Sequence, residues 1–155
     1  MFNFKGIHHV AISVPSLAAA KVFYVEKLGL ELADEDYVPA SDTGDKVTQL
    51  ENAECHLMMV KAGNIFLEIF EFHNPTPNQQ QDRPLSDHGY THFAFEVEDI
   101  QISYDLLAKA GVLWHHRPIE SIEGYWMAYG RDPFGNVIEI QKLGSGRSYS
   151  FDQLS

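Results

Sequence analysis

Two stretches of the chain decide the fold: His9-Val10-Ala11-Ile12-Ser13-Val14 and His92-Phe93-Ala94-Phe95-Glu96-Val97. Each begins with histidine and then places larger apolar side chains at every second position, which is the period of a strand with one apolar face. Ser16 and Asp99, which follow these stretches, are both favourable helix N-caps. The number of residues from Ser16 to Asp99 equals the number from His9 to His92. The chain therefore contains a duplicated structural unit.

A helix is predicted to follow the first strand of each copy. Apolar residues recur at helical spacing over 17–28 and again over 100–108. Gly29 and Gly111 then stand where a residue in the left-handed conformation commonly ends a helix. The stretches that we expect to form the later strands are Thr48–Leu50, Cys55–Val60 and Ile65–Phe72 in the first copy, and Val112–Arg117, Tyr125–Tyr129 and Asn136–Lys142 in the second.

This pattern predicts an α+β fold of two tandem βαβββ modules. Each module alone leaves one face of its sheet bare, so we expect the two sheets to form a partly closed, barrel-like cavity. The predicted modules span residues 5–72 and 90–142, with the Pro- and Gln-rich stretch 73–89 as a linker and 143–155 as a tail.

Composition narrows the class of protein. The net charge of −11 argues against a nucleic-acid partner and an anionic membrane surface, because both need clustered Lys and Arg. No apolar run approaches the ~20 residues needed to span a bilayer, and the N-terminus lacks a signal-like apolar stretch, so we expect a cytoplasmic protein. The one cysteine, Cys55, lies in an apolar run and is expected to be a buried thiol. The acidic run 34–36 is expected to be a solvated loop, with a cation site as the alternative.

Four polar residues occupy matching places in the two copies: His9 and His92 on the first strands, Glu68 and Glu139 on the last. Because strand side chains alternate between faces, all four are expected on the face that the helices do not cover. Two imidazoles and two carboxylates suit one divalent transition metal ion, Ni, Zn, Co, Fe or Mn, rather than Mg or Ca. His8 and Glu71 have the opposite phase, and the other five histidines, which have no repeat partner, are expected to serve as surface or supporting residues: His56, His73, His88, His115 and His116.

Several segments closely resemble the vicinal oxygen chelate superfamily, which includes glyoxalase I, bleomycin-resistance proteins and extradiol dioxygenases. The resemblance covers about residues 5–142 and is carried by Ile7-His-His-Val-Ala-Ile-Ser-Val14, Phe23-Tyr24 before Leu28-Gly29-Leu30, Gly89-Tyr-Thr-His-Phe-Ala-Phe-Glu-Val97 and Asp132-Pro-Phe-Gly-Asn-Val-Ile-Glu-Ile140. It implies paired βαβββ modules, a homodimer, and His9, Glu68, His92 and Glu139 as the metal ligands.

The number of ligands implied by the resemblance favours one reaction type. Four protein ligands leave two positions of a six-coordinate ion for adjacent oxygens of a small carbonyl substrate. That favours a glyoxalase I-type lyase or isomerase, in which Glu139 or Glu68 moves a proton through an enediolate. Fe(II) extradiol dioxygenases use two His and one carboxylate, so a dioxygenase is the second choice. A non-catalytic binding or resistance protein is a third, although such members generally lack a complete ligand set.

The substrate stays open at this level. Glyoxalase I usually supplies Arg for the charges of glutathione, whereas the first module here has none and the chain has Arg83, Arg117, Arg131 and Arg147. Arg83 or Arg117 could still serve the site of a partner subunit. Tyr125-Trp126, with Phe66 and Phe70 flanking Glu68, indicates either an apolar substrate portion or ordinary core.

Overall fold

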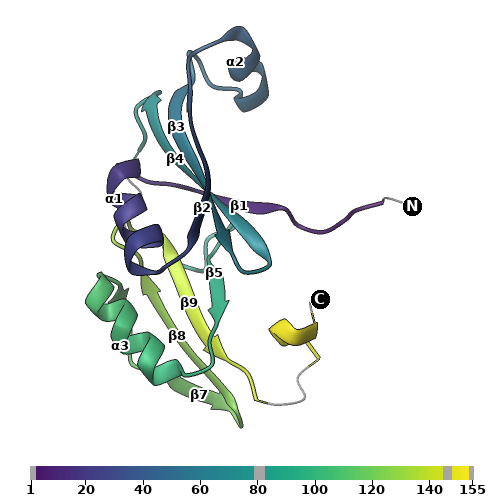
Figure 1. Ribbon diagram of the computed structural model, residues 1–155, viewed down its shortest axis with the longest axis vertical. Helices are drawn as coiled ribbons and strands as arrows, with labels where there is room; N and C mark the ends of the chain where they lie inside the picture. Colours follow the sequence, from purple (N-terminus) through teal and green to yellow (C-terminus); the bar gives the residue numbers. More distant parts are fainter. Residues whose placement is uncertain (1–2, 79–82, 145–147, 154–155) are drawn as a thin grey trace. The chain divides into compact units, whose positions relative to one another are not determined.

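The computed structural model describes residues 3–78, 83–144 and 148–153, and its chain divides into two compact units, Met1–Gln79 and Gln80–Ser155 (Figure 1). The predicted linker residues 79–82 and tail residues 145–147 and 154–155 lie outside the described part. Each unit is an α+β module with one mixed sheet, so the predicted pair of βαβββ modules is confirmed. Both sheets are open rather than closed into barrels.

The first unit begins with the strand and helix that the sequence predicts. β1 covers His9–Ser13, and the Ser16 hydroxyl caps α1, Leu17–Lys21, by accepting from the Ala19 N–H at 3.3 Å. The helix continues as one π-helical segment, Val22–Lys27, and the chain leaves it at Gly29, whose φ of +74° is left-handed. The predicted helix and its glycine stop are therefore confirmed.

The first sheet has the strand order β1-β4-β3-β2. β1 pairs in parallel with β4, Ile65–Asn74, which pairs antiparallel with β3, Glu54–Ala62, and β3 pairs antiparallel with β2, Glu31–Val38. The side chains that fill the core against the helix are almost completely buried: Phe23, Tyr24, Met58, Val60, Leu67 and Ile69.

Two predictions for the first unit are wrong. The stretch Thr48–Leu50 is not a strand, because Thr48 is the last residue of the helix α2, Asp42–Thr48. The N-cap of this helix, Ser41, accepts from the Gly44 N–H at 3.0 Å. The acidic run 34–36 is not a loop, because it lies within β2. β2 forms one edge of the sheet, where solvated charges are tolerated, so its sequence lacks the apolar period of a buried strand.

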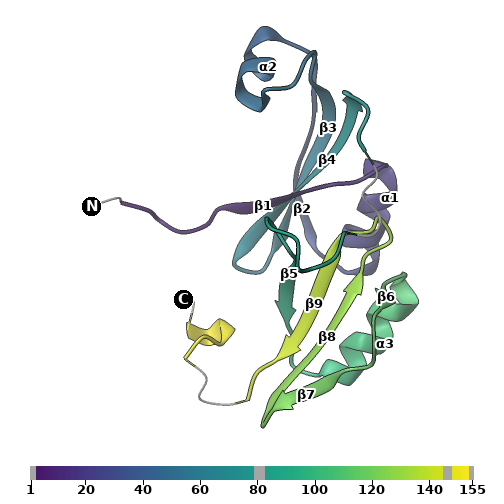
Figure 2. The same cartoon turned by 180° about the vertical axis from the view of Figure 1, so that it is seen from behind.

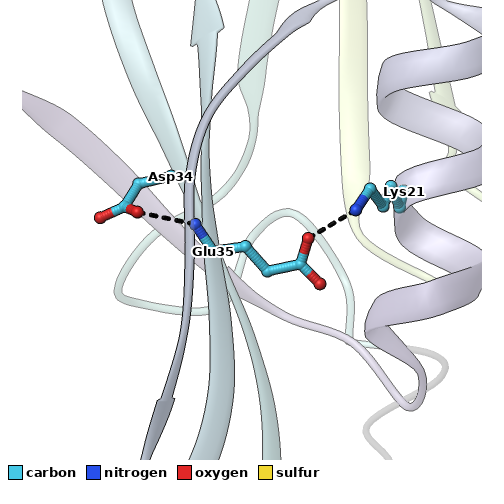
Figure 3. A network of polar contacts seen from close by, with 3 residues as sticks. All are labelled: Lys21, Asp34 and Glu35. Atoms are coloured by element: carbon cyan, nitrogen blue, oxygen red, sulfur yellow. Dashed lines mark hydrogen bonds and ion pairs between the residues drawn. The ribbon is translucent and has the colours of Figure 1, made fainter.

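The acidic run is used for local contacts (Figure 3). Glu35 Oε2 lies 2.5 Å from Lys21 Nζ on α1, and Asp34 Oδ1 accepts from the Glu35 N–H at 3.0 Å. Glu35 is paired across the strand with Met58, so it shares the face that α1 covers. The ion pair therefore ties the rim of the helix to the edge strand.

The second unit repeats the plan of the first. β5, Phe93–Glu96, leads to α3, Ile100–Ala110, whose N-cap Asp99 accepts from the Ile102 N–H and whose last residue precedes Gly111 at a φ of +122°. The sheet order is β5-β9-β8-β6, with β6 at Leu113–Trp114, β8 at Tyr125–Arg131 and β9 at Val137–Lys142. Figure 2 shows β6 beside β8, at the place that β2 takes in the first sheet.

The second sheet differs from the prediction at its edge. The expected strand Val112–Arg117 reduces to the short β6, and an unpredicted strand β7, Ile119–Ile122, also pairs with β8. The core on the α3 side is built on Ile100, Ala128 and Ile140, and Trp126 packs against it. Trp126 therefore belongs to the core and does not share the face of Glu139.

The predicted turn before β9 is confirmed and tightly bonded. Asp132 is only 1% exposed, and its Oδ1 accepts from the N–H groups of Phe134 and Asn136 at 2.9 and 2.8 Å. Gly135 closes the turn with a φ of +94°. This fixed turn sets the start of β9 and hence the phase in which Glu139 emerges.

Candidate metal centre

The first histidine–glutamate pair lies on one face of the first sheet. In the parallel register of β1 and β4, Ala11 pairs with Glu68 and His9 pairs with Phe66, so His9 and Glu68 share a face. Their side chains meet, with His9 Nε2 at 3.3 Å from Glu68 Oε2. This is the face opposite to buried Ile12, so the predicted phase of both residues is confirmed within the unit.

The neighbours of His9 and Glu68 have supporting roles. His8 Nδ1 lies 2.9 Å from His9 Nδ1, and the His8 ring stacks on Phe66 at 5.3 Å, so His8 helps to hold the His9 ring while Nε2 faces Glu68. Glu71 points the other way, where its Oε2 accepts from the Leu17 N–H at the start of α1 at 2.6 Å. Both residues thus differ in role from the candidate ligands.

The second pair has the same arrangement in the second unit. Glu139 pairs with Ala94 of β5 and Tyr129 of β8, and His92 directly precedes β5 in the matching phase. His92 Nε2 lies 3.0 Å from Glu139 Oε2. The other ring nitrogen, Nδ1, lies 2.9 Å from Thr91 Oγ1, and the ring meets Tyr129 edge-on at a centroid distance of 4.9 Å. The imidazole is thus held on three sides.

The Glu139 carboxylate has one oxygen without a partner. Glu139 is only 3% exposed, and its Oε1 is buried with no hydrogen bond. A buried carboxylate oxygen in this state is costly unless a cation or a donor compensates it. Together with the imidazole nitrogen beside it, the Glu139 carboxylate fits the donor set of a transition metal ion.

Each unit supplies one such pair. Within the described residues, no group of three or more His, Cys, Asp or Glu side chains is gathered closely enough to hold an ion. The meeting of His9, Glu68, His92 and Glu139 around one ion therefore stays a prediction. The five histidines without a repeat partner are exposed, as expected; His56 Nδ1 and His73 Nε2 lie 2.8 Å apart.

Comparison with known proteins identifies the family. Residues 6–140 match the Glyoxalase/Bleomycin resistance protein/Dioxygenase superfamily. The chain belongs to this superfamily. It is 32% identical to a 2-epi-5-epi-valiolone epimerase from Actinomyces sp, over 93% of this chain and 82% of that protein.

Solved structures agree with this membership. A glyoxalase family protein from Bacillus cereus is 26% identical with a TM-score of 0.81, covering 92% of this chain and 97% of that one. The trypanothione-dependent glyoxalase I of Leishmania major shares the fold at 24% identity and a TM-score of 0.61, covering 90% of this chain and 87% of that one. Members of the superfamily typically bind a metal ion, which the chemistry of the two pairs suits.

Tyr125 was predicted only as an apolar candidate, and no site prediction included Gln141 or Tyr129, which lie beside Glu139. Tyr125 and Gln141 share its face, and the Tyr125 hydroxyl donates to Gln141 Oε1 at 3.2 Å. Burial, reinforced by the Glu139 carboxylate, raises the pKa of Tyr129, and the same two causes raise the pKa of Tyr125. Both phenols are protonated at neutral pH, as an ordinary tyrosine is, and the raised pKa values extend this state to higher pH. The sequence signal for these residues is the alternation of side chains along each strand, which places Tyr125, Tyr129 and Gln141 on the same face of β8 and β9 as Glu139.

The arginines near this face are already engaged. Arg131 donates from Nη1 to the Gly135 carbonyl at 2.7 Å and from Nη2 to the Arg83 carbonyl at 3.0 Å. Arg83 in turn donates from Nη2 to the carbonyls of Asp87 and His88. These two guanidinium groups hold loops together, and Arg147 lies outside the described residues.

Cys55 is buried, as predicted. It is paired across the strand with Phe72, on the same face of the sheet as Glu68. Burial raises the pKa of the Cys55 thiol, and the charge of Glu68 raises it further. The thiolate form that a nucleophile needs is therefore disfavoured.

Proposed function

We propose that this protein is a metal-dependent isomerase or lyase of the glyoxalase I type, which moves a proton on a carbon next to the carbonyl of a small substrate. The observation that carries the proposal is the buried Glu139 carboxylate, with Oε2 at His92 and Oε1 without a partner. The His9–Glu68 pair repeats the same donor set in the first unit. A repeated carboxylate–imidazole pair, one copy of which contains an almost fully buried carboxylate, is expected to bind a cation rather than to serve stability alone.

His9, Glu68, His92 and Glu139 would hold one divalent transition metal ion: Ni, Zn, Co, Fe or Mn. When bound, such an ion polarises the substrate carbonyl as a Lewis acid. The protein then supplies the proton transfer. We assign the base to Glu139, because its Oε1 has no hydrogen bond to break before it accepts a proton. A positioned carboxylate base of this kind contributes about 10²–10⁴-fold in rate.

The second carboxylate gives the site a choice between products. A proton that returns to the neighbouring carbon gives the lyase or isomerase outcome, whereas a proton that returns to the same carbon from the opposite side inverts its configuration. Glu68, at its own histidine in the first unit, is the candidate for the second transfer. The similarity to a 2-epi-5-epi-valiolone epimerase supports the inverting version.

The substrate is proposed to be a neutral, hydroxylated carbonyl compound. Arg83 and Arg131 are engaged with carbonyl oxygens, so they are poorly placed to neutralise the carboxylates of a glutathione adduct. The Tyr125 hydroxyl and the Gln141 amide beside Glu139 instead match the hydroxyl groups of a polyol or sugar-like ketone.

The test joins metal analysis with hydrogen exchange. Purified protein is loaded with Zn, Co or Ni and incubated in D₂O with a panel of small α-hydroxyketones, and NMR follows deuterium at the carbon next to the carbonyl. We expect exchange by the wild type and its loss in Glu139→Gln, whereas Glu26→Gln, a matched change at an exposed position, keeps it. Full exchange in Glu139→Gln would remove Glu139 as the base.

Analysis of the purified protein also distinguishes the two alternative functions, a dioxygenase and a non-catalytic binding protein. Iron with O₂ consumption on catechols would instead support a dioxygenase. A protein that binds neither metal nor hydroxyketone but retains an apolar ligand would support a binding or resistance role.

A further inference from the structure

The last described segment of the chain, residues 148–153, is fastened to the second unit by a side chain far away in sequence. Its short 3-10 helix covers Phe151–Gln153, and the Phe151 N–H donates to Glu96 Oε2 at 2.9 Å. The Gln153 N–H closes the turn on the Ser150 carbonyl at 2.9 Å. A carboxylate that accepts from the first N–H of a helical turn forms a favourable, charge-assisted bond.

The segment lies on the sheet face that carries the candidate ligands. Glu96 ends β5 and pairs with Gln141, while Ala94, two residues earlier, pairs with Glu139, so Glu96 and Glu139 share a face. Figures 1 and 2 both show α3 on one side of this sheet and the 3-10 helix on the other. The core packed under α3 is therefore on the opposite side from the segment.

Tyr149 stands two residues before Phe151 in the same segment. On the face that carries Glu139, the Tyr125 hydroxyl donates to Gln141 Oε1. Tyr149 and Phe151 remain 54% and 45% exposed, which is the state expected of rings that a bound molecule would cover.

We propose that residues 148–153 form a cover segment over the site face of the second unit, and that the Tyr149 hydroxyl contacts a hydroxyl or carbonyl oxygen of the bound substrate. Glu96 acts as a positioning residue, because its bond to the Phe151 N–H holds the segment in place. The inference rests on the proposed function for the identity of the site. Phenol and amide groups on this face select neutral, hydroxylated ligands over apolar ones.

The test measures ligand affinity and the order of the segment separately. The probe is glycolohydroxamate, a small ligand with vicinal oxygens, titrated by calorimetry into Zn-loaded protein. We expect Tyr149→Phe and Glu96→Gln each to weaken the probe roughly threefold to tenfold, the loss of about one hydrogen bond. Glu98→Gln, a matched change at an exposed position nearby, should bind the probe as the wild type does, and zinc stoichiometry should be unchanged in all three variants.

Hydrogen exchange supplies the second readout. Amide exchange over 149–153 should accelerate in Glu96→Gln and stay as in the wild type in Glu98→Gln. Probe affinity within twofold of the wild type in both Tyr149→Phe and Glu96→Gln, with zinc still bound, would overturn the cover segment while the proposed function stands. A wild type that binds no metal would overturn the proposed function and the role of Tyr149 with it, while exchange would still show whether Glu96 holds the segment.

Discussion

Glu139 Oε2 lies 3.0 Å from His92 Nε2, while the other oxygen of the same carboxylate is buried without a hydrogen bond. The pair is thus half satisfied, since the imidazole partners only one oxygen of a charged group that is almost fully buried. His9 and Glu68 make the equivalent contact at 3.3 Å in the first unit. This repeated geometry is the basis of the metal prediction.

Metal should stabilise the folded protein through these pairs. A ligand at about 100 times its Kd adds about 2.7 kcal/mol, which is roughly 5–10 °C in Tm for a chain of this length. We expect that rise on adding Zn to metal-free wild type and its reversal by EDTA. Glu139→Gln should largely abolish the rise and Glu26→Gln should keep it. Thermal unfolding followed by circular dichroism measures it, and an equal rise in Glu139→Gln would contradict the assigned ligand.

The buried turn before β9 should be sensitive to the side chain of Asp132. Asp132→Ala leaves the N–H groups of Phe134 and Asn136 without their acceptor and should cost about 2–4 kcal/mol. Asp132→Asn retains an acceptor at Oδ1 but places an amide where Oδ2 accepts from Asn136 Nδ2, so its cost should be smaller. Urea unfolding gives both values, and equal costs would contradict this account.

The ion pair of Lys21 and Glu35 should contribute little. Their side chains are 40% and 44% exposed, and exposed pairs are worth about 0–1 kcal/mol. Glu35→Gln should therefore change the free energy of unfolding by less than about 1 kcal/mol, and high salt should reduce the change further. Asp36→Asn on the same strand is the control. A loss well above that value would show that the pair is coupled to the packing of α1.

Tyr129 should resist ionisation in the folded protein. Burial, followed by the Glu139 carboxylate, raises its pKa, whereas an unfolded tyrosine titrates near pH 10. A raised pKa means that the contribution to stability is complete below about pH 10 and is lost as the pH rises above that value, because the unfolded chain then releases the proton first. In an alkaline titration followed by phenolate absorbance, Tyr129→Phe should lack one of the tyrosines that ionise only at high pH in the wild type. An unchanged late phase would contradict the assignment.

Features that depend on local period and capping follow from the sequence. The alternation in 9–14 and 92–97, the caps Ser16 and Asp99, and the turn at Asp132 are all found in the structure. His9 and Glu68 share a face, and so do His92 and Glu139, because the side-chain period of two is set within each strand. The edge strand β2 is absent from the prediction, because consecutive side chains on both of its faces are exposed, and this exposure removes the alternating apolar signal.

The sequence by itself determined the duplicated βαβββ plan and the identity of the His–Glu pairs. Only the tertiary structure decided that Trp126 belongs to the core while the Tyr125 hydroxyl donates to Gln141. It also decided that Glu96 accepts a hydrogen bond from the Phe151 N–H, which is far away in sequence. The physical reason is the range of the interactions. Alternation and capping act over a few residues, whereas these contacts exist only once strand register and the return of the chain bring distant groups together.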